Sequence, residues 1–235
     1  MSTESGNVSH SPEDPRNQRE QQDAQEYLNW VLDRLHEECT QLIVQLGGDP
    51  TKSTLDTEDS SDNGWEEVGK KNQVNQVHVV KTKSSAITQI FRSQIRNMLT
   101  RQGTKNAAHI QPYFCLPLDI HPDHITTLDQ ALKLFLSPEY LGGRTVTATQ
   151  MSFEQLPPVL CIQLGRFWYE NDGSVRKINK FISFPKQLKM AKNYLSDRLK
   201  RQLSAQPGSL DYSLFGGMST SLVFVLERFD SHSFN

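Results

Sequence analysis

The sequence predicts an α+β fold, in which helices and β-hairpins share one hydrophobic core. Apolar residues recur every three or four positions over residues 23–46, which is typical of a long amphipathic helix. Residues 112–120 alternate and residues 157–169 are almost continuously apolar, which is typical of strands. No segment repeats along the chain, and helices mixed with hairpins favour the α+β class.

The composition accommodates a packed core and excludes some classes of protein. Of the 235 residues, 36% are hydrophobic and 22% are charged, and 25 basic against 27 acidic residues give a net charge of −2. Without a basic field, we expect no nucleic-acid partner. The polar N-terminus has no apolar signal segment, and no apolar run approaches a membrane span, so we expect no membrane partner.

Three cysteines lie far apart in the sequence: Cys39, Cys115 and Cys161. They form no CxxC pair, which argues against a disulfide framework and against a zinc site. We therefore expect neither a metal nor another cofactor. A reducing compartment follows, and we expect the protein in the cytoplasm, with the nucleus as a second location.

The first part of the chain divides into three segments. Residues 1–19 are rich in Ser, Pro and Glu and are predicted to be disordered, which leaves residues 20–235 for the folded domain. The helix at 23–46 has an apolar stripe and stops at Gly47-Gly48 and Pro50. The stripe consists of Ala24, Leu28, Val31, Leu35, Cys39, Leu42 and Leu46. Residues from about 50 to 85 lose this periodicity and are predicted to be a mobile loop or disordered insertion.

Shorter elements follow. Residues 85–99 predict a helical turn that runs into a strand, and Pro117 moves the strand at 112–120 toward a sheet edge or a bulge. Thr127 and Gln130 form a capping-box pattern at the start of a helix that ends before Pro138. The strand at 157–169 is predicted to be covered on both faces and to form a hairpin through 171–173. Two further strands are expected near 211–215 and 221–229.

Several segments resemble the ubiquitin-specific protease family of deubiquitinases, and they follow one another along the chain in the same order as in the family. "QQDAQEYLNWVLDRLHEE" is similar to the family's glutamine-aspartate box, and "FEQLPPVLCIQLGRF" and "INKFISFPKQLKM" are similar to its palm strands. "NGWEEVGKKN" and "SAITQIFRSQIR" resemble one branch that lacks zinc-binding cysteine pairs. The resemblance implies a papain-like cysteine-peptidase fold with thumb, palm and fingers, present here as a partial domain, incomplete at both ends.

Two departures from the family pattern stand out. The segment after Leu141-Gly142-Gly143 is short for the family's fingers, which predicts a shortened hairpin. Gly165 stands where the family has lysine, which removes a charge and adds backbone freedom.

The resemblance implies hydrolysis of the isopeptide bond after the C-terminal glycine of ubiquitin, with ubiquitin and ubiquitinated proteins as partners. The family's catalytic cysteine lies upstream of the glutamine-aspartate box, and its histidine lies in a Gly-Gly-His-Tyr box. Here no cysteine precedes Gln21, Met218 follows Gly216-Gly217, and His232 lacks the box. We therefore expect no catalytic residue in this chain, which would be a truncated, inactive form of the enzyme. A noncatalytic ubiquitin-binding scaffold and an unrelated interaction domain are the alternatives.

Other side chains offer weaker candidates for a reactive site. His36 and Cys39 are neighbours on one helical face, but Cys39 lies toward the C-terminal end, where the helix dipole disfavours a thiolate. Cys115 and Cys161 are expected in the core. His121 and His124 predict a loop rather than a metal site.

Asp23 and Glu26 begin the long helix, where an N-cap and a capping box explain both residues. The resemblance adds a second role, because it implies that these carboxylates line the channel for the basic C-terminal tail of ubiquitin. Trp65 is expected in the mobile loop rather than at a docking surface. For Arg166 and Phe167 the expected role is packing of the palm strand.

Overall fold

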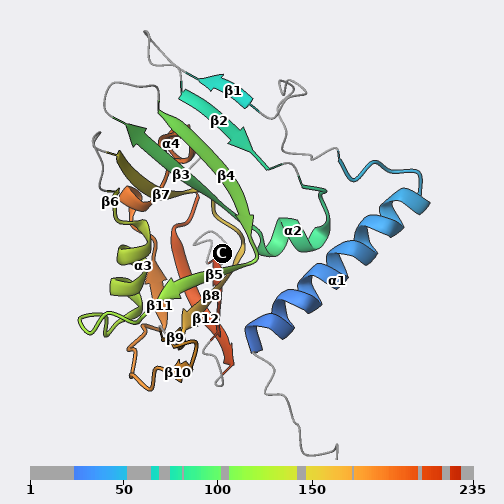
Figure 1. The fold of residues 1–235 in the computed structure, drawn as a ribbon. Coiled ribbons are helices and arrows are strands. Elements are labelled where there is room, and N and C mark those ends of the chain that lie inside the picture. The colour runs from blue at the N-terminus through green and yellow to red at the C-terminus, as the bar shows by residue number, and fades with distance from the viewer. Residues whose placement is uncertain are drawn as a thin grey trace, which may run out of the picture.

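The computed structural model describes residues 24–51, 65–68, 75–80, 82–101, 106–141, 147–170, 172–205, 208–218 and 223–228. These ranges contain helices mixed with runs of consecutive strands, which confirms the α+β prediction (Figure 1). The helices are α1 (Ala24–Gln45), α2 (Ala86–Phe91), α3 (Leu128–Leu136), the 3-10 helix η2 (Lys192–Tyr194) and α4 (Asp197–Ala205). None of the helices in the described ranges is both long and apolar enough to cross a lipid bilayer. Residues 1–19 lie outside the described residues, so their predicted disorder stays a prediction.

The strands form two large sheets and one hairpin. The six-stranded sheet has the order β1-β2-β4-β3-β7-β6, with β1 (Trp65–Val68), β2 (Asn75–Val79), β3 (Ser93–Arg101), β4 (Ala107–Tyr113), β6 (Glu139–Leu141) and β7 (Thr147–Gln155). The five-stranded sheet has the order β11-β12-β13-β8-β5, with β5 (Cys115–Asp119), β8 (Val159–Gly165), β11 (Gln187–Lys189), β12 (Asp211–Met218) and β13 (Val223–Arg228). Strands β9 (Phe167–Tyr169) and β10 (Val175–Lys177) form the hairpin predicted around residues 171–173.

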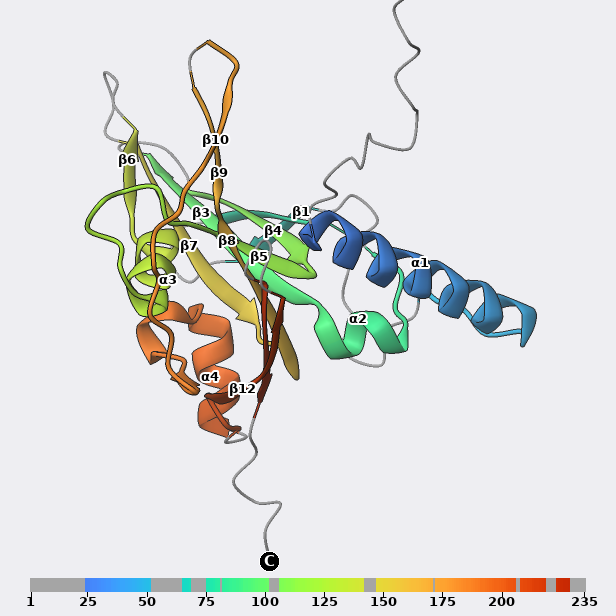
Figure 2. The ribbon, with the colours of Figure 1, turned by 90° about the horizontal axis from the view of Figure 1, so that it is seen from below.

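The core lies between the two sheets and the helices α3 and α4, on the side away from α1 (Figures 1 and 2). Its largest fully buried side chains include Phe153, Leu116 and Tyr212. In β8, Leu160, Ile162 and Leu164 enter this core, whereas Cys161 packs on the other face with Cys115 and Val223. The strand is therefore covered on both faces, as predicted. Figure 1 and Figure 2 both place α1 on the opposite side of the molecule from α3.

Local signals in the sequence predicted several element boundaries correctly. Thr127 and Gln130 form the expected capping box, because the Gln130 amide N–H donates to Thr127 Oγ1 at 3.2 Å and Gln130 Oε1 accepts from the Thr127 amide at 3.0 Å. Helix α2 runs into β3 as predicted. The strand expected at 112–120 is instead divided between β4 and β5, and Pro117 lies on β5, which is an edge strand of its sheet. An edge strand tolerates proline because the missing N–H removes no ladder bond.

The prediction of a loop over residues 50–85 was wrong where strands β1 and β2 form. These strands pair antiparallel, and β2 also pairs with β4 in parallel, with Val77 2% exposed. Val77 and Val79 pack with Ala108 and Ile110, and this small cluster supplies the burial that the local sequence did not reveal. The mobility predicted for this range, and the shortened hairpin after Leu141, stay predictions.

Helix α1 confirms the predicted helix but not the face that it buries. Leu32 is 4% exposed and Thr40 is 6% exposed, whereas Leu42 of the predicted stripe is 55% exposed and Leu46, just past the helix, is 87% exposed. Leu28 packs near the two buried cysteines, and the contacts then follow every fourth residue through Leu32 and His36. A periodic pattern identifies an apolar face, but the neighbouring elements decide which side of a two-faced helix they cover.

A polar contact joins α1 to α2. His36 Nδ1 lies 2.7 Å from Ser85 Oγ, and the same oxygen accepts the Thr88 amide as the N-cap of α2. Because that oxygen already accepts a hydrogen bond, its hydroxyl proton is available to a neutral imidazole. Burial and the charge of Arg92 lower the pKa of His36 below its ordinary value, which favours the same neutral form.

Candidate functional site

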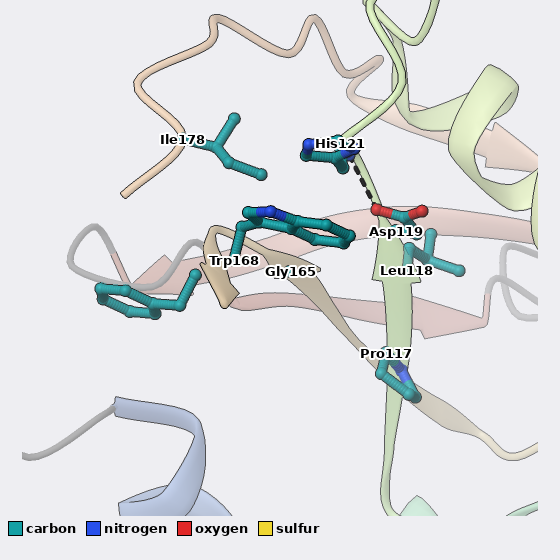
Figure 3. Close-up of a pocket in the computed structure, with 8 residues that line it drawn as sticks. Pro117, Leu118, Asp119, His121, Gly165, Trp168 and Ile178 are labelled. Atoms are coloured by element: carbon teal, nitrogen blue, oxygen red, sulfur yellow. Dashed lines mark hydrogen bonds between the residues drawn. The ribbon is translucent and has the colours of Figure 1, made fainter. Parts of the chain in front are cut away.

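The candidate site is a pocket where strands β5 and β8 end. The two strands are parallel, and Asp119 pairs with Gly165 at their last positions. The chain then turns into β9, which brings aromatic side chains to the same place. The pocket has a volume of about 270 Å³ (Figure 3). Its lining residues are Pro117, Leu118, Asp119, His121, Gly165, Phe167, Trp168 and Ile178.

The loop after β5 forms one wall of this pocket. The His121 amide donates to Asp119 Oδ1 at 2.7 Å, which folds the loop back over the strand end. The His121 ring stacks on Trp168, with 4.0 Å between ring centroids and 17° between planes. Figure 3 shows this stack, with Asp119 beside it. His121 and His124 therefore belong to a loop, as predicted, and the described residues contain no group of three potential metal ligands.

Two cationic side chains, Lys180 and Arg166, hold the segments around the pocket together by hydrogen bonds to main-chain oxygens. Lys180 Nζ donates to the carbonyls of Ile120 and Pro122 at 3.0 and 2.6 Å. Arg166 is 8% exposed, and its Nη1 donates to the carbonyls of Ile178 and Lys180 at 2.9 and 2.8 Å. Burial lowers the pKa of Arg166, although a guanidinium stays charged in proteins. The packing role predicted for Arg166 is confirmed.

Replacement of Arg166 by methionine should lower the free energy of unfolding by about 1.5–3 kcal/mol, because the two carbonyls lose a charged donor. Chemical denaturation measures this change. Arg176→Met is the matched control, since the Arg176 side chain is 76% exposed and its pair with Glu170 should contribute at most about 1 kcal/mol. Equal losses in both variants would contradict a special role for Arg166.

Phe167 differs from its prediction. It is 40% exposed and lines the pocket, so it does not act only in palm packing. Trp168, 43% exposed, and Asp119 were not predicted as site residues at all. The sequence does contain a signal for these residues. Two aromatic residues follow one buried strand, and a carboxylate ends another. If the two strands are parallel, these side chains lie close together.

Gly165 shapes the floor of the pocket. A Cβ atom there would lie 3.4 Å from the Leu118 carbonyl oxygen, which is an ordinary contact, so the backbone does not require glycine. Because glycine has no side chain, nothing from this position fills the pocket beside Asp119.

The structure describes all three cysteines, and two of them lie in the core. Cys115 of β5 and Cys161 of β8 are opposite each other in the strand register, and their exposed fractions are 6% and 1%. Burial raises the pKa of the Cys161 thiol to about 11, which suppresses the thiolate at neutral pH. Cys39 is half-buried on α1, and the nearby His36 directs Nδ1 to Ser85. The expected core positions of Cys115 and Cys161 are confirmed.

The predicted tail-binding carboxylates are only partly described. Glu26 lies exposed in the first turn of α1, whereas Asp23 lies outside the described residues. Their role in binding stays a prediction. Trp65 belongs to β1, but its side chain lies outside the description, as does all of His232. Gly216 and Gly217 lie within β12, opposite Val225 and Phe224 of β13.

The described fold combines a long helix with two large sheets, and solved ubiquitin-specific protease domains share this fold. The match to solved structures supports this class. The chain shares a TM-score of 0.56 at 22% identity with the SAGA Ubp8/Sgf11/Sus1/Sgf73 DUB module bound to ubiquitin aldehyde, covering 88% of this chain and 44% of that one. Identity at this level shows the fold alone.

The chain belongs to the ubiquitin carboxyl-terminal hydrolase family, whose model matches residues 7–221. It is 38% identical to ubiquitin hydrolase B of Dictyostelium discoideum over 186 residues, which are 73% of this chain and 40% of that protein. It is 33% identical to ubiquitin carboxyl-terminal hydrolase 10 of Rattus norvegicus over 204 residues, 77% of this chain and 26% of that protein. The chain thus spans less than half the length of these relatives. The predicted family and fold are confirmed, and so is the predicted similarity to the branch of ubiquitin carboxyl-terminal hydrolase 10.

Proposed function

We propose that this chain binds ubiquitin and ubiquitinated proteins through a deubiquitinase palm and thumb, and that the 235-residue chain alone does not hydrolyse them. The family to which it belongs consists of thiol-dependent hydrolases. The position of the cysteines is the observation that supports the proposed lack of hydrolysis. Two are buried together between strands, and the histidine beside the third is engaged by a serine hydroxyl.

Peptide-bond attack requires a thiolate and a histidine within hydrogen-bond reach of it. Burial opposes thiolate formation at Cys161, and Nδ1 of His36 is already engaged in a hydrogen bond with Ser85 Oγ at 2.7 Å. Hydrolysis therefore needs a cysteine and a histidine that the described residues do not bring together. A noncatalytic ubiquitin-binding scaffold would share the same binding surface, and ubiquitin binding is thus the first property to test.

Charge reversal at Asp23 and Glu26 should weaken binding of ubiquitin about ten-fold or more, because a charge-assisted hydrogen bond contributes about 1.5–3 kcal/mol. Isothermal titration calorimetry with free ubiquitin measures the change. The double variant should also depend less on salt, since it has lost the attraction that salt screens.

Asp33→Lys is the matched control, because Asp33 is an exposed carboxylate farther along the same helix. It should leave the affinity for ubiquitin within about two-fold, as expected for a surface charge outside the contact. Should affinity stay constant in the Asp23/Glu26 variant while only thermal stability falls, by about 1 kcal/mol, the two residues would act only as helix caps. The absence of any ubiquitin binding by the unchanged chain would overturn the proposed function.

A further inference from the structure

Helix α4 has an exposed serine that follows a run of basic residues. Its segment "RLKRQLS" places Arg198, Lys200 and Arg201 before Ser204. Ser204 and Arg201 are both exposed. Among the serines and threonines whose exposure the structure describes, only Ser204 has an arginine three positions before it. Figures 1 and 2 place α4 on the side of the molecule away from α1.

We propose that Ser204 is a phosphorylation site for a protein kinase that selects basic substrates. Such a kinase binds the arginine three residues before the acceptor with its own carboxylates, because a guanidinium pairs with a carboxylate through two N–H groups. In the reaction the hydroxyl oxygen of Ser204 attacks the γ-phosphorus of ATP, the bond from this phosphorus to the β-phosphate oxygen breaks, and ADP leaves. The hydroxyl proton passes to the catalytic base of the kinase.

The position of Ser204 in the last turn of α4 makes its hydroxyl accessible. The helix ends at Ala205, and helix ends fray. Leu199 is the one buried side chain of α4, whereas Leu203, in the last turn, is only partly buried. Opening of the last turn therefore exposes little apolar surface and requires far less free energy than unfolding of the core. The Ser204 hydroxyl donates to the Lys200 carbonyl at 2.8 Å, and phosphorylation removes this hydrogen bond.

Two cations in the preceding turn are placed to pair with a phosphate on Ser204. Lys200 and Arg201 lie four and three residues before it, and side chains at these spacings are neighbours on a helix. Both now bind Asp197, since Lys200 Nζ donates to Asp197 Oδ1 and Arg201 Nε donates to the Asp197 carbonyl, each at 3.1 Å. The Asp197 side chain is 90% exposed, so its ion pair is weak. A phosphate with a charge near −2 competes for both cations.

The electrostatics of α4 favour the ionised phosphate. The negative end of the helix dipole carries about half a charge and opposes an anion there. Two full positive charges on Lys200 and Arg201 outweigh it, and nearby cations favour the charged form of an acid. The second pKa of the phosphate should therefore lie below its ordinary value of about 6. The site goes beyond the proposed function and does not depend on ubiquitin binding.

The test incubates the full chain with magnesium, ATP and the catalytic subunit of protein kinase A, which selects arginine before the acceptor. Fragmentation mass spectrometry should locate a phosphate on Ser204, and Ser204→Ala should remove it. Arg201→Gln should lower the initial rate at Ser204 at least about ten-fold, because one charge-assisted pair with the kinase is lost. Arg176→Gln is the matched control, because Arg176 is an exposed arginine of β10, and it should leave the rate within about two-fold.

Two outcomes would overturn the proposal. One is phosphorylation of other residues without phosphorylation of Ser204. The other is an equal rate at Ser204 in Arg201→Gln and Arg176→Gln. Amide spectra of each variant verify that it is folded, so that a changed rate reports recognition by the kinase.

Phosphorus NMR of the phosphorylated chain tests the pairing within α4. The second pKa of the phosphate should rise by a few tenths of a unit in Lys200→Gln, which retains Arg201 for the kinase. Lys189→Gln, an exposed lysine of β11, should leave this pKa unchanged. An equal phosphate pKa in Lys200→Gln and in the unchanged chain would refute the assignment of the phosphate to the cations of α4.

Discussion

The purified 235-residue chain is expected to leave a ubiquitin derivative with an electrophilic C-terminus unmodified, even after long incubation at neutral pH. Loss of a catalytic thiolate or of its base typically lowers the rate by several orders of magnitude. Here Cys161 is 1% exposed with a pKa raised to about 11, and Cys115 lies beside it, 6% exposed. Cys39 has His36 as its neighbour on α1, and Nδ1 of that histidine lies 2.7 Å from Ser85 Oγ. Mass spectrometry of the intact protein measures the labelling.

Two controls give the negative result its meaning. Rat ubiquitin carboxyl-terminal hydrolase 10 serves as a positive control for the probe. Iodoacetamide in denaturant should modify all three cysteines, which shows that the thiols are intact. Covalent labelling by the ubiquitin probe that disappears in Cys39→Ala, Cys115→Ala or Cys161→Ala would reveal a nucleophile and refute the proposed lack of activity.

Replacement of Arg96 by methionine should lower the free energy of unfolding by about 3–5 kcal/mol at pH 7. Arg96 forms two hydrogen bonds to Glu154, at 2.8 and 3.2 Å, and the Glu154 side chain is only 2% exposed. Removing one partner of a buried pair leaves an uncompensated charge, which costs about this much. Arg198→Met is the control. Arg198 lies 3.6 Å from the same carboxylate but is 63% exposed, so its loss should cost at most about 1 kcal/mol.

The pH dependence of this effect follows from the carboxyl group. Burial alone would raise the pKa of Glu154, but the hydrogen bonds and charge of Arg96, with Ser196 and Arg198, hold it below its ordinary value. A carboxyl group whose pKa is lower in the folded than in the unfolded protein stabilises the fold at every pH above the unfolded-state pKa. This stabilisation is lost as the pH falls through the folded-state pKa. The difference between wild type and Arg96→Met should therefore be largest at neutral pH and narrow in acid.

A second substitution separates the charge from the packing. In Arg96→Met/Glu154→Leu the buried charge is absent, and the free energy of unfolding should recover by several kcal/mol relative to Arg96→Met. Chemical denaturation at pH 7 and at a pH below about 4, under the ordinary pKa of glutamate, measures all four proteins. A loss of less than about 1 kcal/mol in Arg96→Met would show that Glu154 is solvated, contrary to its burial.

The sequence by itself determined the fold class and several local elements, because these depend on short-range chemistry. Thr127 and Gln130 cap α3 through groups three residues apart, and the hairpin after β9 follows from its turn residues. The order of the family-like segments also predicted the family, since each motif is readable without its neighbours. Cys161 was correctly expected in the core because its strand is apolar on both faces.

Only the tertiary structure decided which surfaces these elements bury and what they bring together. The stripe predicted on α1 was displaced, because contacts with α2 and the sheet edge, rather than the apolar period, select Leu32 and Thr40. Strand β2 forms because β4 lies beside it, which no local pattern indicates. Asp119 and Trp168 are 49 positions apart in the sequence. They share a pocket because β5 and β8 pair in parallel, and parallel pairing joins residues that no short window of sequence contains.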